Sequence, residues 1–200
     1  MRKKKKHIII AVLLTSVLAA TAAPQKKRLP SFIGIESCKK CHEAAAIGNQ
    51  YGMWLSSPHA KAYQTLTTQK AVDIAEKAAA GAPVESMQCL KCHTTGGGKT
   101  DATRTEGVGC EACHGPGSIY HDFSNHASFE SRENSYRKAV SLGMYPILKL
   151  EGIKAREKLC RYCHTAERAC FPENPDERRR QNLPLSLIAD FPYRHPVLRR

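Results

Sequence analysis

Cys38-Lys39-Lys40-Cys41-His42 is the first of four runs of the form Cys-x-x-Cys-His in this chain; the others begin at Cys89, Cys110 and Cys160. Random placement of nine cysteines and nine histidines in 200 residues would give such a run only about 0.02 times. Cysteines three positions apart lie on one side of a helical turn. There, each thiol can bond one vinyl group of the same porphyrin, and the next histidine can reach the iron. The four runs therefore predict four haem c groups, each attached covalently.

The motifs assign two roles. The cysteines predicted to attach the haems are Cys38, Cys41, Cys89, Cys92, Cys110, Cys113, Cys160 and Cys163, and the predicted proximal iron ligands are His42, His93, His114 and His164. Zinc sites, a disulfide framework and a thioredoxin-like motif are the alternative uses of such cysteines. None of these needs a histidine directly after every second cysteine, so haem attachment is the favoured interpretation.

The first 22 residues are predicted to be an export signal. Five basic residues at positions 2–6 precede an apolar stretch at 8–20, and Ala20-Thr21-Ala22 fits a small-x-small cleavage site. The apolar stretch is short for a membrane span, so we expect cleavage, with an uncleaved anchor as the alternative. The sequence thus predicts a periplasmic or extracellular protein in which residues 23–200 form one tetrahaem cytochrome c domain.

The formal net charge of +13 does not indicate a nucleic-acid partner. Removing the five basic residues of the signal leaves +8, and four ferric haems with their propionates add roughly −4. The expected holoprotein is only mildly basic, and the chain lacks the mixture of aromatic and basic residues typical of nucleic-acid binding. We expect redox proteins as partners, with a membrane-associated donor or acceptor and a homo-oligomer left open.

The expected fold is mainly α with long irregular loops, and the haems form its core. Only one Trp, seven Tyr and five Phe are available for a conventional core, so the porphyrins would supply the missing apolar surface. The sequence pattern predicts helices over 38–55, 59–80, 128–142 and 151–164, and no strand. We expect breaks at 56–58 and 81–83, a cap from Ser56 or Ser57, and a Pro-rich strap over 171–200. The haems of the second and third motifs are expected to be neighbours.

Four histidines remain as candidate distal ligands: His59, His121, His126 and His195. Four spare histidines for four haems make bis-histidine ligation of every iron feasible, which is typical of electron transfer; an iron with one open face could instead bind a small molecule. At least one of His121 and His126 is expected to ligate. Met53, Met87 and Met144 are alternatives, although methionine more often packs in a core. Cys170 belongs to no pair, and a free or buried thiol is the favoured interpretation.

Two segments resemble the tetrahaem cytochrome c-554 family. One runs from Cys38-x-x-Cys41-His42 through Trp54 to Ser57-x-His59-Ala60-x-Ala62; the other is the segment 108–117, Val-Gly-Cys-Glu-Ala-Cys-His-Gly-Pro-Gly. The resemblance covers roughly residues 35–165, and it implies a mainly helical periplasmic protein with haems in closely stacked pairs.

The resemblance also implies ligand pairs. His59 would pair with His164, and His121 or His126 with His42. His195 would pair with His114, and His93 would stand alone on a five-coordinate iron.

Three functions follow from these expectations. The leading hypothesis is an electron carrier. The second is an enzyme that reduces a small nitrogen oxide or hydroxylamine at one open haem, although the Cys-x-x-Cys-Lys motif of multihaem nitrite reductases is absent from the sequence. The third is a subunit of an extracellular cytochrome filament, because similar tetrahaem chains polymerise.

Overall fold

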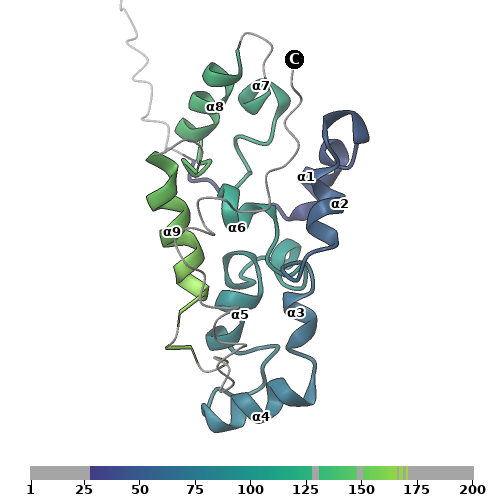
Figure 1. Cartoon of the computed structure of the whole chain (residues 1–200), viewed down its shortest axis with the longest axis vertical. Coiled ribbons are helices and arrows are strands. Elements are labelled where there is room, and N and C mark those ends of the chain that lie inside the picture. The colour runs from purple at the N-terminus through teal and green to yellow at the C-terminus, as the bar shows by residue number, and fades with distance from the viewer. Residues whose placement is uncertain (1–27, 128–130, 148–150, 166, 169, 171–200) are drawn as a thin grey trace, which may run out of the picture.

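A computed structural model describes residues 28–127, 131–147, 151–165, 167–168 and 170 (Figure 1). These residues form helices and loops and contain no strand, which confirms the mainly α prediction. None of the helices in the described ranges is long and apolar enough to cross a membrane. The α-helices are α1 (Ile35–His42), α2 (Gln50–Leu55), α3 (Ala62–Thr65), α4 (Gln69–Lys77), α5 (Met87–His93), α6 (Cys110–His114), α7 (Phe123–His126), α8 (Arg132–Ser141) and α9 (Glu151–Cys163). Three 3-10 turns add η1 (Ala45–Ile47), η2 (Thr95–Gly97) and η3 (Asp101–Thr103).

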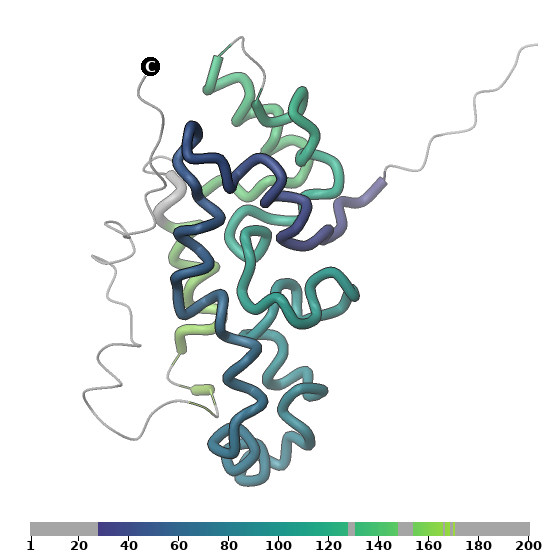
Figure 2. Tube along the Cα trace, turned by 90° about the vertical axis from the view of Figure 1, so that its right-hand side faces the viewer, coloured from purple at the N-terminus to yellow at the C-terminus, as the bar shows by residue number. Residues whose placement is uncertain are grey.

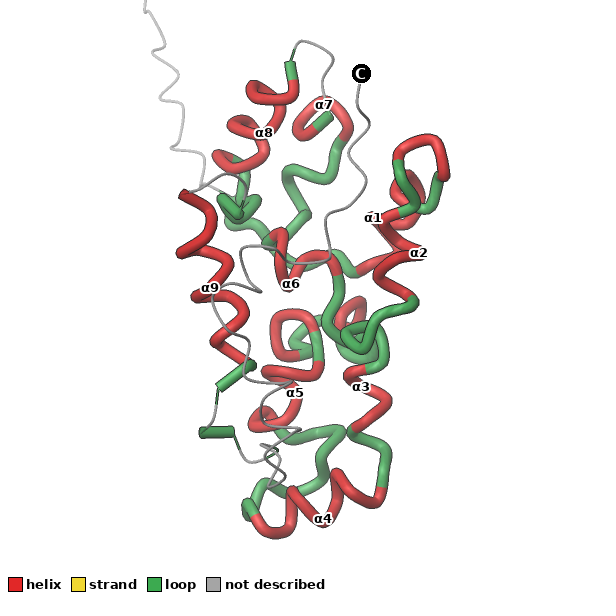
Figure 3. The backbone as a smooth tube through the Cα atoms, in the orientation of Figure 1, coloured by secondary structure: helices red, strands yellow, loops and turns green. Residues whose placement is uncertain are grey.

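The described chain is elongated, with α4 at one end and α7 and α8 at the other (Figures 1 and 2). The short helix α6 lies near the middle, between α9 on one side and α1 on the other (Figure 1). Helix α5 contacts both α3 and α9, and α6 contacts α1 and η2. Long loops separate the helices over most of the chain (Figure 3).

The single helix expected over 38–55 is wrong, because the chain forms α1, η1 and α2 there. Two residues in left-handed conformation, Gly48 at φ 103° and Asn49 at φ 45°, turn the backbone between η1 and α2. The Asn49 side chain then caps α2 by accepting a hydrogen bond of 3.0 Å from the Gly52 N–H, as asparagine does at helix starts. The predicted break after Leu55 is confirmed.

The helix expected over 59–80 is also divided, into α3 and α4. Thr65, Thr67 and Thr68 each donate a hydrogen bond from the hydroxyl to the carbonyl three residues earlier. Such local bonds compete with the helical pattern. The Thr68 hydroxyl then caps α4 by accepting from the Ala71 N–H. The expected cap from Ser56 or Ser57 is wrong, because Lys61 precedes α3 and its side chain makes no cap bond.

Two later helices agree with the ranges predicted from the sequence. Helix α9 occupies nearly the whole range predicted over 151–164. Helix α8 lies within the range predicted over 128–142 and begins after Ser131, whose hydroxyl accepts a bond of 3.0 Å from the Asn134 N–H. The predicted strap over 171–200, with His195, lies outside the described residues, as does the predicted signal over 1–22.

The described residues contain a small apolar core. Their buried apolar side chains are Ile35, Leu66, Ala75, Leu90, Tyr120 and Ala139. These residues come from different elements along the chain rather than from one helix face. The polar residue Glu111 is as deeply buried as the apolar Leu90, each at 1% exposed.

Candidate haem sites

Each Cys-x-x-Cys-His motif lies on a helix. The first three motifs lie in α1, α5 and α6, and the fourth ends α9 with His164 just beyond it. Helical geometry places both thiols of a motif on one side of the turn, as attachment to one porphyrin requires. All nine cysteines are free thiols, so the structure contains no disulfide framework. The described residues also hold no cluster of three or more His, Cys, Asp or Glu side chains arranged for a metal ion.

Thiols from different motifs meet in two places. Cys38 of the first motif is hydrogen-bonded to Cys110 of the third, and this contact is the main cause that lowers the pKa of Cys38 and raises that of Cys110. A bond to Cys163 of the fourth motif likewise lowers the pKa of Cys92, of the second motif, to about 7. We expected the second and third motifs to be neighbours. In the structure the thiols in contact join the first motif to the third and the second to the fourth.

The imidazole of His42 faces that of His126, with ring centroids 6.3 Å apart and ring planes inclined by 27°. Each ring is held through its other nitrogen. The Nδ1 of His42 lies 3.2 Å from Oε1 of Gln50, and the Nδ1 of His126 lies 3.0 Å from the carbonyl oxygen of Asp122. Both contacts leave Nε2 available for a metal, an arrangement common among metal-bound histidines.

His59 lies edge-on to His164, with ring centroids 6.0 Å apart and planes inclined by 81°. Burial is the main cause that lowers the pKa of His59, and the charge of His164 adds to the shift. A lowered pKa keeps the imidazole neutral near pH 7, which is the form that binds a metal.

These two separations fit a haem iron between the rings. An imidazole nitrogen bonds a transition metal at about 2 Å, and the ring centre lies about 1 Å beyond that nitrogen. Two imidazoles on opposite faces of one iron therefore have centroids about 6 Å apart. The observed 6.3 Å and 6.0 Å match this value, so the residues present fit axial ligation of two haems.

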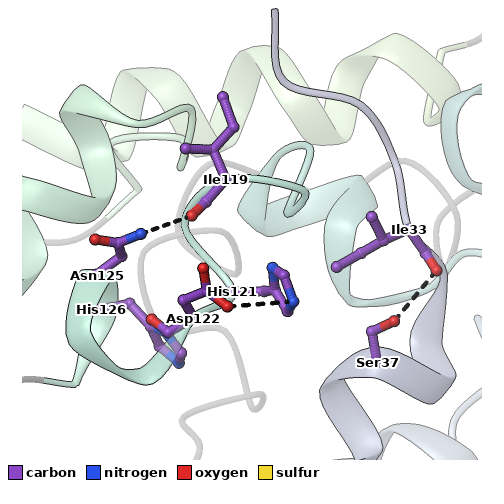
Figure 4. A network of polar contacts seen from close by, with 7 residues as sticks. All are labelled: Ile33, Ser37, Ile119, His121, Asp122, Asn125 and His126. Carbon is purple, nitrogen blue, oxygen red and sulfur yellow. Dashed lines mark hydrogen bonds and ion pairs between the residues drawn. The ribbon is translucent and has the colours of Figure 1, made fainter. Parts of the chain in front are cut away.

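His121 is directed elsewhere. It is exposed, and its Nε2 lies 3.7 Å from Oδ1 of Asp122; Figure 4 shows this contact and the separate position of His126. Asn125 donates a bond of 2.9 Å to the Ile119 carbonyl and so ties α7 to the preceding turn. Of the two histidines that the sequence left open, the structure brings His126 to His42.

His93 has a different environment. Its Nδ1 lies 2.8 Å from the carbonyl oxygen of Ala62 and 3.0 Å from the hydroxyl of Thr65, both on α3. Within the described part of the chain no other histidine ring lies against it. These partners of His93 could not be predicted, because a hydrogen bond to a backbone carbonyl leaves no residue pattern. The predicted pairing of His114 with His195 involves a residue outside the described ranges.

A glycine loop holds His59 in place. Gly107 has φ +80°, and a Cβ there would lie 2.6 Å from the carbonyl oxygen of His59. The next N–H, of Val108, donates a bond of 2.9 Å to that same oxygen. The Trp54 indole N–H donates a bond of 2.8 Å to the Val108 carbonyl. This loop therefore fixes the backbone from which the His59 ring projects.

Two carboxylates join the first and third motifs. Glu111, between the cysteines of α6, accepts hydrogen bonds from the N–H groups of Ile33, Gly34 and Gly117. Glu106 accepts one of 2.8 Å from the N–H of Ile35 at the start of α1. We did not predict either role, since a Glu within or near a haem motif reads as a surface residue. Together the two side chains hold α1 against α6.

Cys-x-x-Cys-His motifs on helices, with histidine rings facing across the width of one iron, define a c-type cytochrome. Residues 37–115 match the family described as "Cytochrome c554 and c-prime", and this segment carries the first three motifs. The chain is also similar to cytochrome c-554 of Nitrosomonas europaea, with 32% identity over 123 residues.

The match to that relative covers 55% of this chain and spans half of the relative's length. No solved structure matches the chain significantly. The two sequence matches confirm the resemblance seen in the residues. The chain is thus similar to the cytochrome c-554 family over residues 37–115, and this similarity supports a c-type cytochrome with covalently bound haem c.

Proposed function

We propose that this chain is a tetrahaem electron carrier that works outside the cytoplasm, passing electrons between redox proteins. The observation that supports this most directly is the pair of thiol contacts, Cys38 with Cys110 and Cys92 with Cys163. Thiols of two motifs that lie near enough to shift each other's pKa would bring the attachment edges of two porphyrins together. Each pair of haems would then exchange electrons over a short distance.

In this proposal the eight motif cysteines hold the four haems. His42, His93, His114 and His164 bind their irons on one face, and each bound haem supplies a one-electron couple. His126 would bind the iron of His42 from its other face, and His59 that of His164. Two imidazoles on one iron leave no position for a substrate, which suits a carrier. His195 would bind the iron of His114 from its other face, which completes the ligand pairs implied by the family resemblance.

The haems would also complete the core. The few buried apolar side chains of the described residues cannot alone bury the helices, and four porphyrins would add the missing apolar surface. Attachment of haem c takes place outside the cytoplasm, which agrees with the export signal predicted over residues 1–22. The donor and acceptor would be other redox proteins, either dissolved or membrane-associated.

Mass spectrometry of the protein from its native host, or from a host with haem-attachment machinery, tests the number of attached haems. We expect the mass of residues 23–200 plus four haems. A mass with fewer haems, or with zinc, would contradict the proposal. A ferric spectrum recorded with and without carbon monoxide, after reduction, then counts the irons that have an open face.

A second function is supported by the surroundings of His93. Its ring is held by α3, and the family resemblance implies a five-coordinate iron at this motif. An open iron could bind and reduce a small nitrogen oxide or hydroxylamine. Ligand binding by about one haem in four, with turnover of nitric oxide or hydroxylamine by a reduced sample, would support this function. A spectrum that carbon monoxide leaves unchanged would exclude it.

A further inference from the structure

Glu106 lies between the first and third haem-attachment helices. Its Oε2 accepts a hydrogen bond of 2.8 Å from the N–H of Ile35, three residues before Cys38. Its Oε1 approaches the backbone just before Cys110 so closely that a Cβ on Gly109 would lie 2.6 Å from it. The carboxylate is therefore enclosed between the two helices that would carry one pair of haems.

One oxygen of this carboxylate is buried and has no hydrogen-bond partner, namely Oε1. The Thr95 hydroxyl is close enough to lower the pKa of Glu106 in part, but it donates at 3.4 Å to the Gly107 carbonyl and accepts at 2.8 Å from the Gly109 N–H. A buried oxygen without a donor is poorly stabilised when charged and well suited to carry a proton. This oxygen therefore has the chemistry of a proton site.

Burial and the neighbouring carboxylates favour the protonated form of Glu106. Burial is the main cause that raises the pKa of Glu106; Thr95 and the Ile35 N–H oppose the shift, and the carboxylates of Glu111 and Glu36 add to it. Glu111 already accepts bonds from the N–H groups of Ile33, Gly34 and Gly117. Glu36 is exposed and lies 3.7 Å from the Lys39 ammonium. Both neighbouring carboxylates therefore have polar partners of their own.

We propose that Glu106 takes up a proton when an electron reaches the haems attached at Cys38 and Cys110, and releases it on reoxidation. The step balances: the donor's electron converts ferric to ferrous iron, solvent supplies the proton, and an O–H bond forms at Oε1. The added electron disfavours a nearby anion, so it raises proton affinity. By linkage, protonation in turn favours the reduced state. This inference rests on the proposed electron-carrier function.

Redox titration of the holoprotein at several pH values tests the proposal. In the native chain the potentials of one haem pair should fall as pH rises. The limit is about 59 mV per pH unit, the value for one proton per electron. Glu106→Gln should flatten this dependence. Glu76→Gln, a matched change at an exposed residue on α4 at the far end of the molecule (Figure 1), should retain it.

Haem propionates also titrate, so persistence of the full slope in Glu106→Gln would overturn the proposal. Infrared difference spectra of the native holoprotein provide a readout that needs no variant. Reduction should produce the carbonyl band of a protonated carboxyl group, and Glu106→Gln should lack it. Absence of that band from the native chain would also overturn the proposal. A preparation that carries no haem would instead contradict the electron-carrier function itself.

Discussion

The ring of His59 lies edge-on to the ring of His164 with centroids 6.0 Å apart, although one precedes α3 and the other follows α9. Helix α5 contacts both α3 and α9 and so provides the framework that brings them together. Helix α5, which carries the second motif, therefore brings together His59 and His164. These two histidines would bind the iron of the haem attached at the fourth motif.

The first prediction concerns His59. His59→Ala should leave haem attachment intact, because no thiol changes, but should open one iron. We expect the ferric spectrum to gain a high-spin fraction of about one haem in four, and carbon monoxide to bind one additional haem after reduction. An unchanged spectrum would show that His59 is not an axial ligand.

The second prediction separates His126 from His121. His126→Ala should create a new high-spin haem, because its ring faces His42 at 6.3 Å. His121→Ala should have no such effect, because that exposed ring is directed toward Asp122. The two variants lie five residues apart and remove the same side chain, so each serves as the control for the other. The reverse result would assign ligation to His121.

The third prediction tests the loop that holds His59. Gly107→Ala would place a Cβ 2.6 Å from the His59 carbonyl oxygen at φ +80°. A non-glycine residue in that conformation costs about 1–3 kcal/mol, and the clash adds to this. We expect lower stability together with partial loss of His59 ligation, measured as a high-spin fraction.

Gly81→Ala is the matched control for that loop variant. Gly81 has φ +74° but no heavy atom within 4 Å of an added Cβ, so only the backbone strain remains. It should lower the free energy of unfolding by about 1–3 kcal/mol through this strain alone and leave the spectrum unchanged. An equal spectral change in both variants would indicate general loosening rather than a specific role of the loop.

The motif helices could be predicted from the sequence because the two cysteines of a Cys-x-x-Cys-His motif must lie on one side of a helical turn to bond the same porphyrin. Helix α9 was predicted nearly to the residue, since no left-handed residue or hydroxyl interrupts it. The breaks at Asn49 and Thr68 were missed because both depend on local side-chain bonds to the backbone. Such bonds offer the backbone an alternative to the helical pattern, and apolar periodicity does not register them.

The sequence predicted the residue types of the candidate site, and the family resemblance implied the pairs His59 with His164 and His126 or His121 with His42, but the contact between the first and third motifs was not predicted. Sequence spacing places the second and third motifs together, whereas the structure brings Cys110 to Cys38. That contact is set by Glu106 and Glu111, which bind backbone N–H groups at the start of α1. Carboxylates that bind backbone leave no signal in a single sequence, because any residue can supply the N–H.

The fourth prediction concerns Glu111, which is 1% exposed. Its carboxylate accepts bonds from Ile33 at 3.0 and 3.1 Å, from Gly34 at 2.8 Å and from Gly117 at 2.6 Å. In Glu111→Gln an amide NH₂ replaces one acceptor oxygen and faces backbone donors. A hydrogen bond to a charged group contributes about 1.5–3 kcal/mol, and a buried donor left without a partner costs about 1–3 kcal/mol. We therefore expect a loss of about 2–4 kcal/mol in the free energy of unfolding.

Guanidinium unfolding of the holoprotein, followed by haem absorption, measures this loss. Glu85→Gln, at an exposed position before α5, removes the same charge and should change stability by less than about 0.5 kcal/mol. Because Glu111 holds Gly34 and Ile33 against α6, its substitution should also weaken the coupling between the haems at Cys38 and Cys110. A Glu111→Gln protein as stable as Glu85→Gln would mean that the buried carboxylate does not hold these segments together.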